Sequence, residues 1–264
     1  MPALAPPGRT RRLSRGAKIS LVVAAVFALV AAIVIPLAGS FEPPEQRFAR
    51  LMREAAGVQP ESHHGFGRQR QLDDAVRAQY RRLLEQNREY IASVKQMDTS
   101  KVHGLNSSEA YLNPEAEQEG LAQLHALFAA DADQEQKVQG IISDLREVLA
   151  KYAGSSGERE AMLRGFDDSV AKQFAKRQEA IAGEKAWVDA VDALHAYAGA
   201  HRDAFTTTKG HLIIRDQAVR SEFNAKVELQ EEKRREFMQL QQQFSQAQAQ
   251  SLGKMGLRQK DIGK

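Results

Sequence analysis

The sequence contains no cysteine and a single tryptophan among its 264 residues. Without cysteine the chain cannot form disulfides, thiolate zinc sites or cysteine-ligated iron–sulfur clusters, and it has no cysteine nucleophile. It also lacks a Gly-x-Ser-x-Gly nucleophile elbow, a phosphate-binding P-loop and a Gly-x-Gly-x-x-Gly motif. We therefore expect a protein that is not an enzyme and needs no cofactor.

The folded part of the chain also lacks an excess of charge of one sign. Five of the 37 basic residues lie in a tail over residues 1–18 that contains no acid: Arg9, Arg11, Arg12, Arg15 and Lys18. The remaining 32 basic residues face all 34 acids, so the chain beyond residue 40 has a net charge of −2. Nucleic-acid-binding domains carry a basic patch on the folded body. The sequence therefore predicts a near-neutral body and no nucleic-acid partner.

One long apolar segment follows this tail, because no residue between Ile19 and Phe41 is charged. Roughly 20 helical residues at about 1.5 Å each cross a hydrocarbon layer of about 30 Å. Residues 19–41 are therefore predicted to form one transmembrane helix. The alternative is a cleaved signal peptide with a processing site at the small residues Ala38, Gly39 and Ser40. We favour the retained anchor, since apolar regions of signal peptides usually have only about 7–15 residues.

The flanks of this segment predict its orientation. The five basic residues precede it, whereas Glu42 and Glu45 follow it. The positive-inside rule then keeps residues 1–18 in the cytoplasm and exports everything after residue 41. The expected location is a bacterial inner membrane, with the body in the periplasm.

The body is predicted to be a bundle of long amphipathic helices, which makes the fold class all-α. A short helix over 43–56 is followed by a loop over 57–67 and by a long helix over 68–98, whose apolar residues recur every three or four positions. Residues 99–112 are expected to be a polar connection. Further helices are expected from Asn113 to about 152, with a kink or break at 131–136, from 158 to about 203, with Gly183 as a weak point, and from Asp216 to about 250.

Residues 205–214 are the one stretch with strand character, because β-branched residues flank Lys209-Gly210. This pattern favours a small β-hairpin or an extended crossover. The predicted organisation is thus a tail over 1–18, an anchor over 19–41, an exported helical domain over 42–250 and a flexible tail over 251–264. An extended coiled coil is the alternative, and the glycine breaks and the hairpin argue against it.

Two patches resemble a known family. Leu37-Ala38-Gly39-Ser40-Phe41 looks like a bacterial lipobox with serine in place of the lipid-modified cysteine, and Glu45-Gln46-Arg47-Phe48 follows it. The second patch runs from Leu194 through Tyr197, Phe205, Gly210 and Ile213 to Phe223-Asn224. The chain in this respect resembles bacterial envelope lipoproteins with a helical domain of unknown function. The resemblance implies an envelope location and no activity. Without cysteine at position 40, the apolar segment would replace the lipid.

A metal site has weak candidates in Asp189, Asp192 and His195, because helical acid-x-x-His spacing places two ligands on one face. Solvated groups on a helix face are the favoured interpretation, so no metal is expected. His63-His64 is interpreted as an exposed linker. Asp167-Asp168 diverges by about 100° on a helix, which argues against acid–base catalysis.

Two basic clusters, Arg81-Arg82 and Lys233-Arg234-Arg235, have acids close by along the chain. Ion pairs at i, i+4 within each helix are expected to neutralise them.

The leading functional hypothesis is a membrane-anchored, non-catalytic scaffold domain that binds another envelope protein or a second copy of itself. A bundle that binds a lipid or another apolar ligand, lined by Phe166, Phe174, Trp187 and Phe205, is the alternative. An enzyme ranks last.

Overall fold

The computed structural model describes residues 44–61, 67–152, 155–254 and 256. The basic tail, the apolar segment 19–41, the candidate processing site at Ala38–Ser40 and the pair His63-His64 all lie outside these residues. Within the part of the chain that is described, no helix is both long and apolar enough to cross a membrane.

The described structure is mostly helical, with one small two-stranded antiparallel sheet, as the sequence predicts. Its elements, in chain order, are α2 (Pro44–Ala55), α3 (Arg68–Gln96), the 3-10 turn η1 (Val102–Gly104), α4 (Ser108–Leu112), α5 (Pro114–Tyr152), α6 (Ser156–Ala200), the 3-10 turn η2 (Arg202–Ala204), β1 (Phe205–Thr208), β2 (His211–Ile214) and α7 (Gln217–Lys254).

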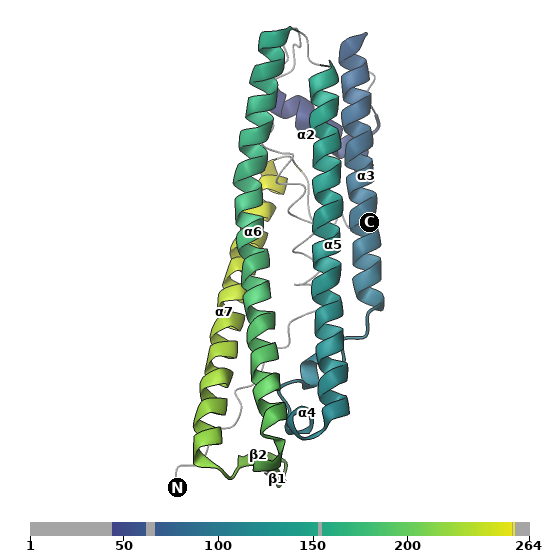
Figure 1. Ribbon diagram of the computed structural model, residues 1–264. Helices are drawn as coiled ribbons and strands as arrows, with labels where there is room; N and C mark the ends of the chain where they lie inside the picture. Colours follow the sequence, from purple (N-terminus) through teal and green to yellow (C-terminus); the bar gives the residue numbers. More distant parts are fainter. Residues whose placement is uncertain (1–43, 62–66, 153–154, 255, 257–264) are drawn as a thin grey trace.

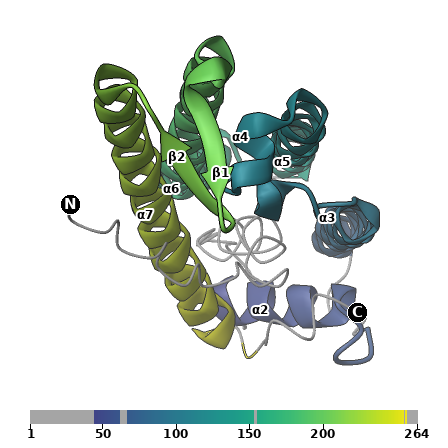
Figure 2. The ribbon, with the colours of Figure 1, turned by 90° about the horizontal axis from the view of Figure 1, so that it is seen from below.

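The four long helices lie side by side in chain order, α3 against α5, α5 against α6 and α6 against α7 (Figure 1). Viewed along the bundle axis, the four helices form an arc (Figure 2). The sheet and α4 lie at one end of the bundle. Helix α2 crosses the other end. We call the end with α2 the proximal end and the end with α4 and the sheet the distal end. At about 1.5 Å per residue, the 45 residues of α6 extend over roughly 68 Å between them.

Local sequence signals explain where several helices begin. Asn113 precedes Pro114 at the start of α5, and its Oδ1 accepts a hydrogen bond from the backbone N–H of Glu115 at 3.0 Å. Asp216 caps α7, because its Oδ1 accepts from the backbone N–H groups of Ala218 and Val219 at 2.7 and 3.1 Å. Each cap satisfies N–H groups that the first helical turn leaves unpaired. Both starts agree with the sequence prediction.

Three details differ from the sequence predictions, and the first is that helix α5 is continuous through residues 131–136. Helix α6 is one long helix through Gly183, as predicted. A Cβ on Gly183 would lie 2.7 Å from Leu240 Cδ1, so this glycine allows α7 to approach closely. The connection over 99–112 contains η1 and α4, and the Ser107 hydroxyl caps α4. Helix α7 continues to Lys254, beyond the expected end at 250, because Phe244 and Leu252 still provide it with buried side chains.

The hairpin over 205–214 is present as predicted. Phe205 pairs with Ile214 and Thr208 with His211, so the connecting loop consists of Lys209 and Gly210. Both loop residues have positive φ, 54° and 79°. Positive φ at both central positions is the geometry of the two-residue turn that best matches the twist of a hairpin, and glycine adopts it without a steric cost.

Three apolar clusters follow one another along the bundle. The first joins α2, α3, α5 and α6 at the proximal end and includes Met52, Leu72 and Leu149. The second, around Trp187 and Phe237, joins α5, α6 and α7, and the third, around Phe205, joins α4, α6, α7 and the hairpin. Polar side chains lie between and beside these clusters, and they include the charged groups that the fold buries.

Candidate functional site

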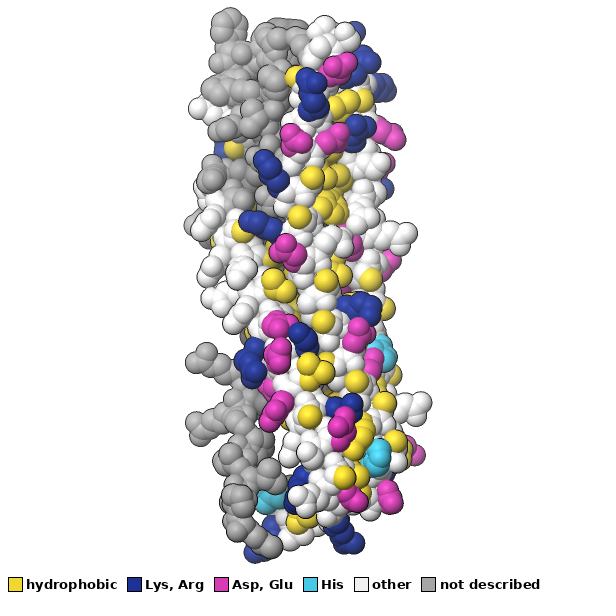
Figure 3. Space-filling model, turned by 60° about the vertical axis from the view of Figure 1, so that its left-hand side comes forward, with side chains coloured by type: hydrophobic (Ala, Val, Ile, Leu, Met, Phe, Trp, Pro, Cys, Tyr) yellow, Lys and Arg dark blue, Asp and Glu magenta, His cyan; other side chains and the backbone are white. Residues whose placement is uncertain are grey.

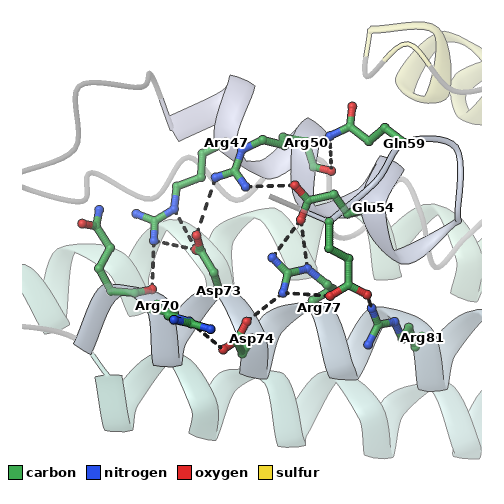
Figure 4. Close-up of polar contacts among 11 residues, drawn as sticks. Arg47, Arg50, Glu54, Gln59, Arg70, Asp73, Asp74, Arg77 and Arg81 are labelled. Carbon is green, nitrogen blue, oxygen red and sulfur yellow. Dashed lines mark hydrogen bonds and ion pairs between the residues drawn. The ribbon is translucent and has the colours of Figure 1, made fainter. Parts of the chain in front are cut away.

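The proximal end contains a network of buried ion pairs between α2 and α3 (Figure 4). We call it the proximal ion-pair cluster and define it by five residues: Arg47, Arg50 and Glu54 of α2, and Asp73 and Arg77 of α3. All five are buried, and the side chain of Glu54 has no exposed surface. The partially exposed side chains of Asp74, Glu61 and Arg81 extend the network toward solvent.

Each buried carboxylate in this cluster meets two guanidinium groups. Arg77 places Nε 2.9 Å and Nη2 2.8 Å from Glu54 Oε2, and Arg50 Nη1 lies 3.1 Å from Glu54 Oε1. Arg47 donates from Nε to Asp73 Oδ1 at 2.8 Å, and Arg50 Nη2 lies 3.6 Å from Asp73 Oδ2. Burying a charge is costly unless it is paired and hydrogen-bonded. The cluster therefore fixes α2 in one position on α3.

Sequence reasoning missed this cluster, although a signal was present. Arg47, Arg50 and Glu54 are spaced at three and four residues, which places them on one face of α2. Asp73 and Arg77 have the same spacing and flank the apolar stripe of α3. Which of these charged groups face one another depends on how the two helices cross, and the spacing within each helix does not determine that.

The predicted pairing of Arg81 and Arg82 within their own helix is wrong. Arg81 pairs with Glu61 in the segment after α2, and Arg82 pairs with Asp144 on α5. The second basic cluster follows the prediction more closely, because Lys233 pairs with Glu236 and Arg234 with Glu231, both within α7 at i, i+3 spacing. In the adjacent pair Asp167-Asp168, which was considered for acid–base catalysis, Asp167 accepts two hydrogen bonds from Arg146 of α5, at 2.8 and 2.9 Å.

A second polar group, which we call the middle polar layer, separates the first and second apolar clusters. It consists of Asn87 and Tyr90 of α3, Asp131, Gln134 and Glu135 of α5, and Arg177 of α6. Tyr90 donates to Asp131, and Arg177 forms an ion pair with Glu135. Burial lowers the pKa of Arg177 to about 10, and burial beside Asp131 raises the pKa of Tyr90 well above its usual value.

Several atoms of the middle polar layer are buried without a hydrogen bond to any described residue. They are both side-chain polar atoms of Asn87, the amide nitrogen of Gln134 and Nη1 of Arg177. A buried polar atom without a partner costs about 1–3 kcal/mol. The layer therefore reduces stability in the middle of the bundle. In the sequence Asn87 stands out as the one polar residue in the apolar stripe of α3.

The third polar group lies at the distal end, and we call it the distal histidine cluster: Tyr111, Glu117, His195 and Arg202. His195 has no exposed surface, and its Nδ1 lies 3.3 Å from Glu117 Oε1. Glu117 also pairs with Arg202, whose Nε donates to the backbone oxygen of Tyr111 at 3.3 Å. The rings of Tyr111 and His195 stack with their centroids 5.1 Å apart.

Burial lowers the pKa of His195 below its ordinary value of 6.5, although Glu117, Asp192 and the backbone of Leu105 favour the protonated ring. The second ring nitrogen, Nε2, is buried and makes no hydrogen bond of ordinary geometry with a described residue. Burial also raises the pKa of Tyr111, so this phenol stays protonated. The fold thus favours a neutral imidazole at this position.

The three weak metal candidates have three different partners. Asp189 pairs with Lys185, Asp192 accepts from His125 Nε2 at 2.9 Å on the surface, and His195 faces Glu117 in the interior. The structure does not bring these three side chains together. Among the described residues, no group of three or more acidic or histidine side chains is arranged to hold a metal ion.

The four aromatic residues considered for an apolar ligand are distributed along the bundle. Phe166 and Phe174 belong to the first apolar cluster, Trp187 to the second and Phe205 to the third. Trp187 stacks on Phe237 with centroids 5.8 Å apart. These aromatic side chains therefore pack in separate parts of the core and do not line one common site.

Comparison with known proteins finds no matching family model, no matching curated protein and no matching solved structure. The resemblance to envelope lipoproteins therefore stays a prediction from the sequence.

Proposed function

We propose that this chain is a membrane-anchored helical scaffold of a bacterial envelope, with its body exported and engaged with another envelope protein. The proximal ion-pair cluster carries the proposal. Helix α2 begins at Pro44, three residues after the apolar segment 19–41 ends, and buried ion pairs attach it to α3. A transmembrane helix at 19–41 would therefore connect to a rigid joint, and the bundle would keep a defined orientation relative to the membrane.

The length of the bundle supports the scaffold role. If the proximal end faces the membrane, the hairpin and α4 lie roughly 68 Å away along α6. Such a body carries a contact surface well beyond the lipid headgroups. The surface also suits a protein partner better than a nucleic acid, because Lys and Arg alternate with Asp and Glu along the face seen in Figure 3. Binding of nucleic acid would require a stripe of basic side chains.

The absence of cysteine allows a direct test of topology, since each introduced cysteine is the only thiol. Ser143 is exposed on α5, and Ser14 belongs to the basic tail. In intact cells a membrane-impermeant maleimide should label a Ser143→Cys variant, and it should label a Ser14→Cys variant only after the membrane is permeabilised. Labelling of Ser14→Cys alone in intact cells would reverse the topology and end the proposal.

A second experiment tests the scaffold role. A photo-crosslinking residue at Thr207, exposed at the distal end, should capture a distinct envelope protein in living cells. The same residue at Ser143, exposed toward the proximal end of α5, is the matched control and should capture it less efficiently. Crosslinks to a second copy of the chain alone, from both positions, would replace the scaffold by a homo-oligomer.

A further inference from the structure

The distal histidine cluster contains one carboxylate for two basic side chains. Glu117 accepts from Arg202 and lies 3.3 Å from His195 Nδ1. With a neutral ring, Nδ1–H donates to Glu117 and the carboxylate balances Arg202 alone. A protonated ring adds a second positive charge beside the same carboxylate, at a side chain that has no exposed surface. Protonation therefore places a second buried cation beside a carboxylate that already balances Arg202.

The other charged and titratable groups around His195 do not supply a second free carboxylate. Asp192, one turn earlier on α6, is bonded to His125 of α5. Glu231 of α7, which acts on Tyr111, is bonded to Arg234 at 2.9 and 3.1 Å. Tyr111 of α4 is a neutral phenol. The carboxylates around His195 on α5, α6 and α7 thus all have another basic partner already.

His195 also contributes to the contacts that attach the distal elements to α6. Tyr111 of α4 lies between the His195 ring and Phe223 of α7, with a centroid distance of 5.0 Å to Phe223. Phe205 of β1 meets the same Phe223 at 5.2 Å. A displaced His195 ring therefore disturbs α4 first and the hairpin through Phe223.

We propose that the distal histidine cluster is a proton-sensitive contact: protonation of His195 in mild acid loosens α4 and the hairpin from α6 while the proximal end stays folded. An exported protein of a bacterial envelope would meet such acid directly, but the proposal does not depend on membrane anchoring or on a partner.

Linkage between proton binding and folding gives the direction in which the stability of the distal end changes with pH. The fold depresses the pKa of His195 below its unfolded value of 6.5, so the stabilisation of the distal end is complete above that value and is lost as the pH falls below it. One pH unit corresponds to a tenfold change in the population of a protonated open state. Between pH 7 and pH 5.5 we therefore expect the open population of the distal end to increase about fivefold to tenfold.

Hydrogen exchange on the full chain in detergent micelles tests this expectation. After correction for intrinsic rates, peptides covering 105–112 and 205–214 should lose protection about fivefold to tenfold between pH 7 and 5.5. Peptides covering 68–84 at the proximal end should keep theirs. The His195→Gln variant retains a donor toward Glu117 without a titrating ring, and its distal exchange should not depend on pH in this range.

His125→Gln is the matched control, because His125 lies on the same α5–α6 interface, has a carboxylate partner and is exposed. This variant should respond to acid as the wild type does. The proposal is overturned by unchanged distal protection in the wild type, by a response that persists in His195→Gln, or by equal losses at both ends. If His195→Gln does not fold, the imidazole NMR titration of His195 in the wild type decides, since its midpoint must lie below 6.5 and coincide with the distal change.

Discussion

At the proximal end each buried carboxylate meets two arginines, whereas at the distal end one carboxylate meets an arginine and a histidine. The guanidinium group keeps its charge throughout the physiological range, so mild acid leaves the basic partners of the proximal pairs unchanged. Imidazole changes its charge near neutral pH. The same device, a buried ion pair between neighbouring elements, is thus insensitive to mild acid at one end and sensitive at the other.

Removing one guanidinium group from the proximal ion-pair cluster tests this difference between the two ends most directly. An Arg77→Met variant keeps most of the buried side-chain volume but takes two hydrogen bonds from Glu54, whose side chain is fully buried. Removing one partner of a buried pair typically costs about 3–5 kcal/mol. We expect a loss of about 3 kcal/mol in the free energy of unfolding, since Arg50 still pairs with Glu54, measured by urea denaturation.

Arg81→Met is the matched control for this variant. Arg81 lies one turn further along α3 and pairs with Glu61, but about half of its side chain is exposed. Exposed pairs contribute about 0–1 kcal/mol. Equal losses from the two variants would show that burial does not distinguish these ion pairs and would remove the argument for a rigid proximal joint.

The two ends also differ in how tightly they are packed. Substituting alanine for two glycines of α5 tests this difference. A Cβ on Gly120, near the distal end, would lie 2.6 Å from Leu105 Cδ2 and 3.2 Å from the backbone oxygen of Lys101. A Cβ on Gly140, toward the proximal end, would meet no atom within 4 Å. Because overpacking typically costs about 1–3 kcal/mol, Gly120→Ala should lower stability by about 2 kcal/mol.

Gly140→Ala serves as the control in the same helix. Alanine is favoured over glycine in a helix interior by about 1 kcal/mol, and nothing opposes it at this position. Urea denaturation should therefore give shifts of opposite sign for the two variants. A stabilising effect of Gly120→Ala would mean that Leu105 and η1 move away at little cost and that the distal end is loosely packed.

The helices could be predicted from sequence because their signals are local. The three- and four-residue recurrence of apolar side chains in α3 and the caps at Asn113 and Asp216 depend on residues within one or two turns. Local signals mark Gly183 only as a weak point of this helix and do not explain why glycine stands there. A glycine lowers helix propensity locally, and the sequence gives no sign that Leu240 packs against this position.

The polar clusters could not be predicted because they join residues far apart in the chain. His195 and Glu117 are 78 positions apart, and Arg82 and Asp144 are 62 apart. Their contact depends on the register between antiparallel helices, and periodicity within one helix does not specify that register. Asp189, Asp192 and His195 share one helix, and the spacing that made them metal candidates directs each to a different partner.

The smallest change in stability that we expect comes from a substitution in the middle polar layer. Asn87 is almost fully buried, and its amide makes no hydrogen bond to any described residue. Leucine has a similar size and no polar atom, so Asn87→Leu removes an unsatisfied group from the apolar stripe of α3. We expect the free energy of unfolding to increase by about 1 kcal/mol, with the pH response of the distal end unchanged. Arg88→Leu, at the next and exposed position, should change stability by less than about 0.5 kcal/mol. A loss of stability in Asn87→Leu would show that the amide has a partner in solution, and the two ends of the bundle would then be joined by a satisfied polar layer.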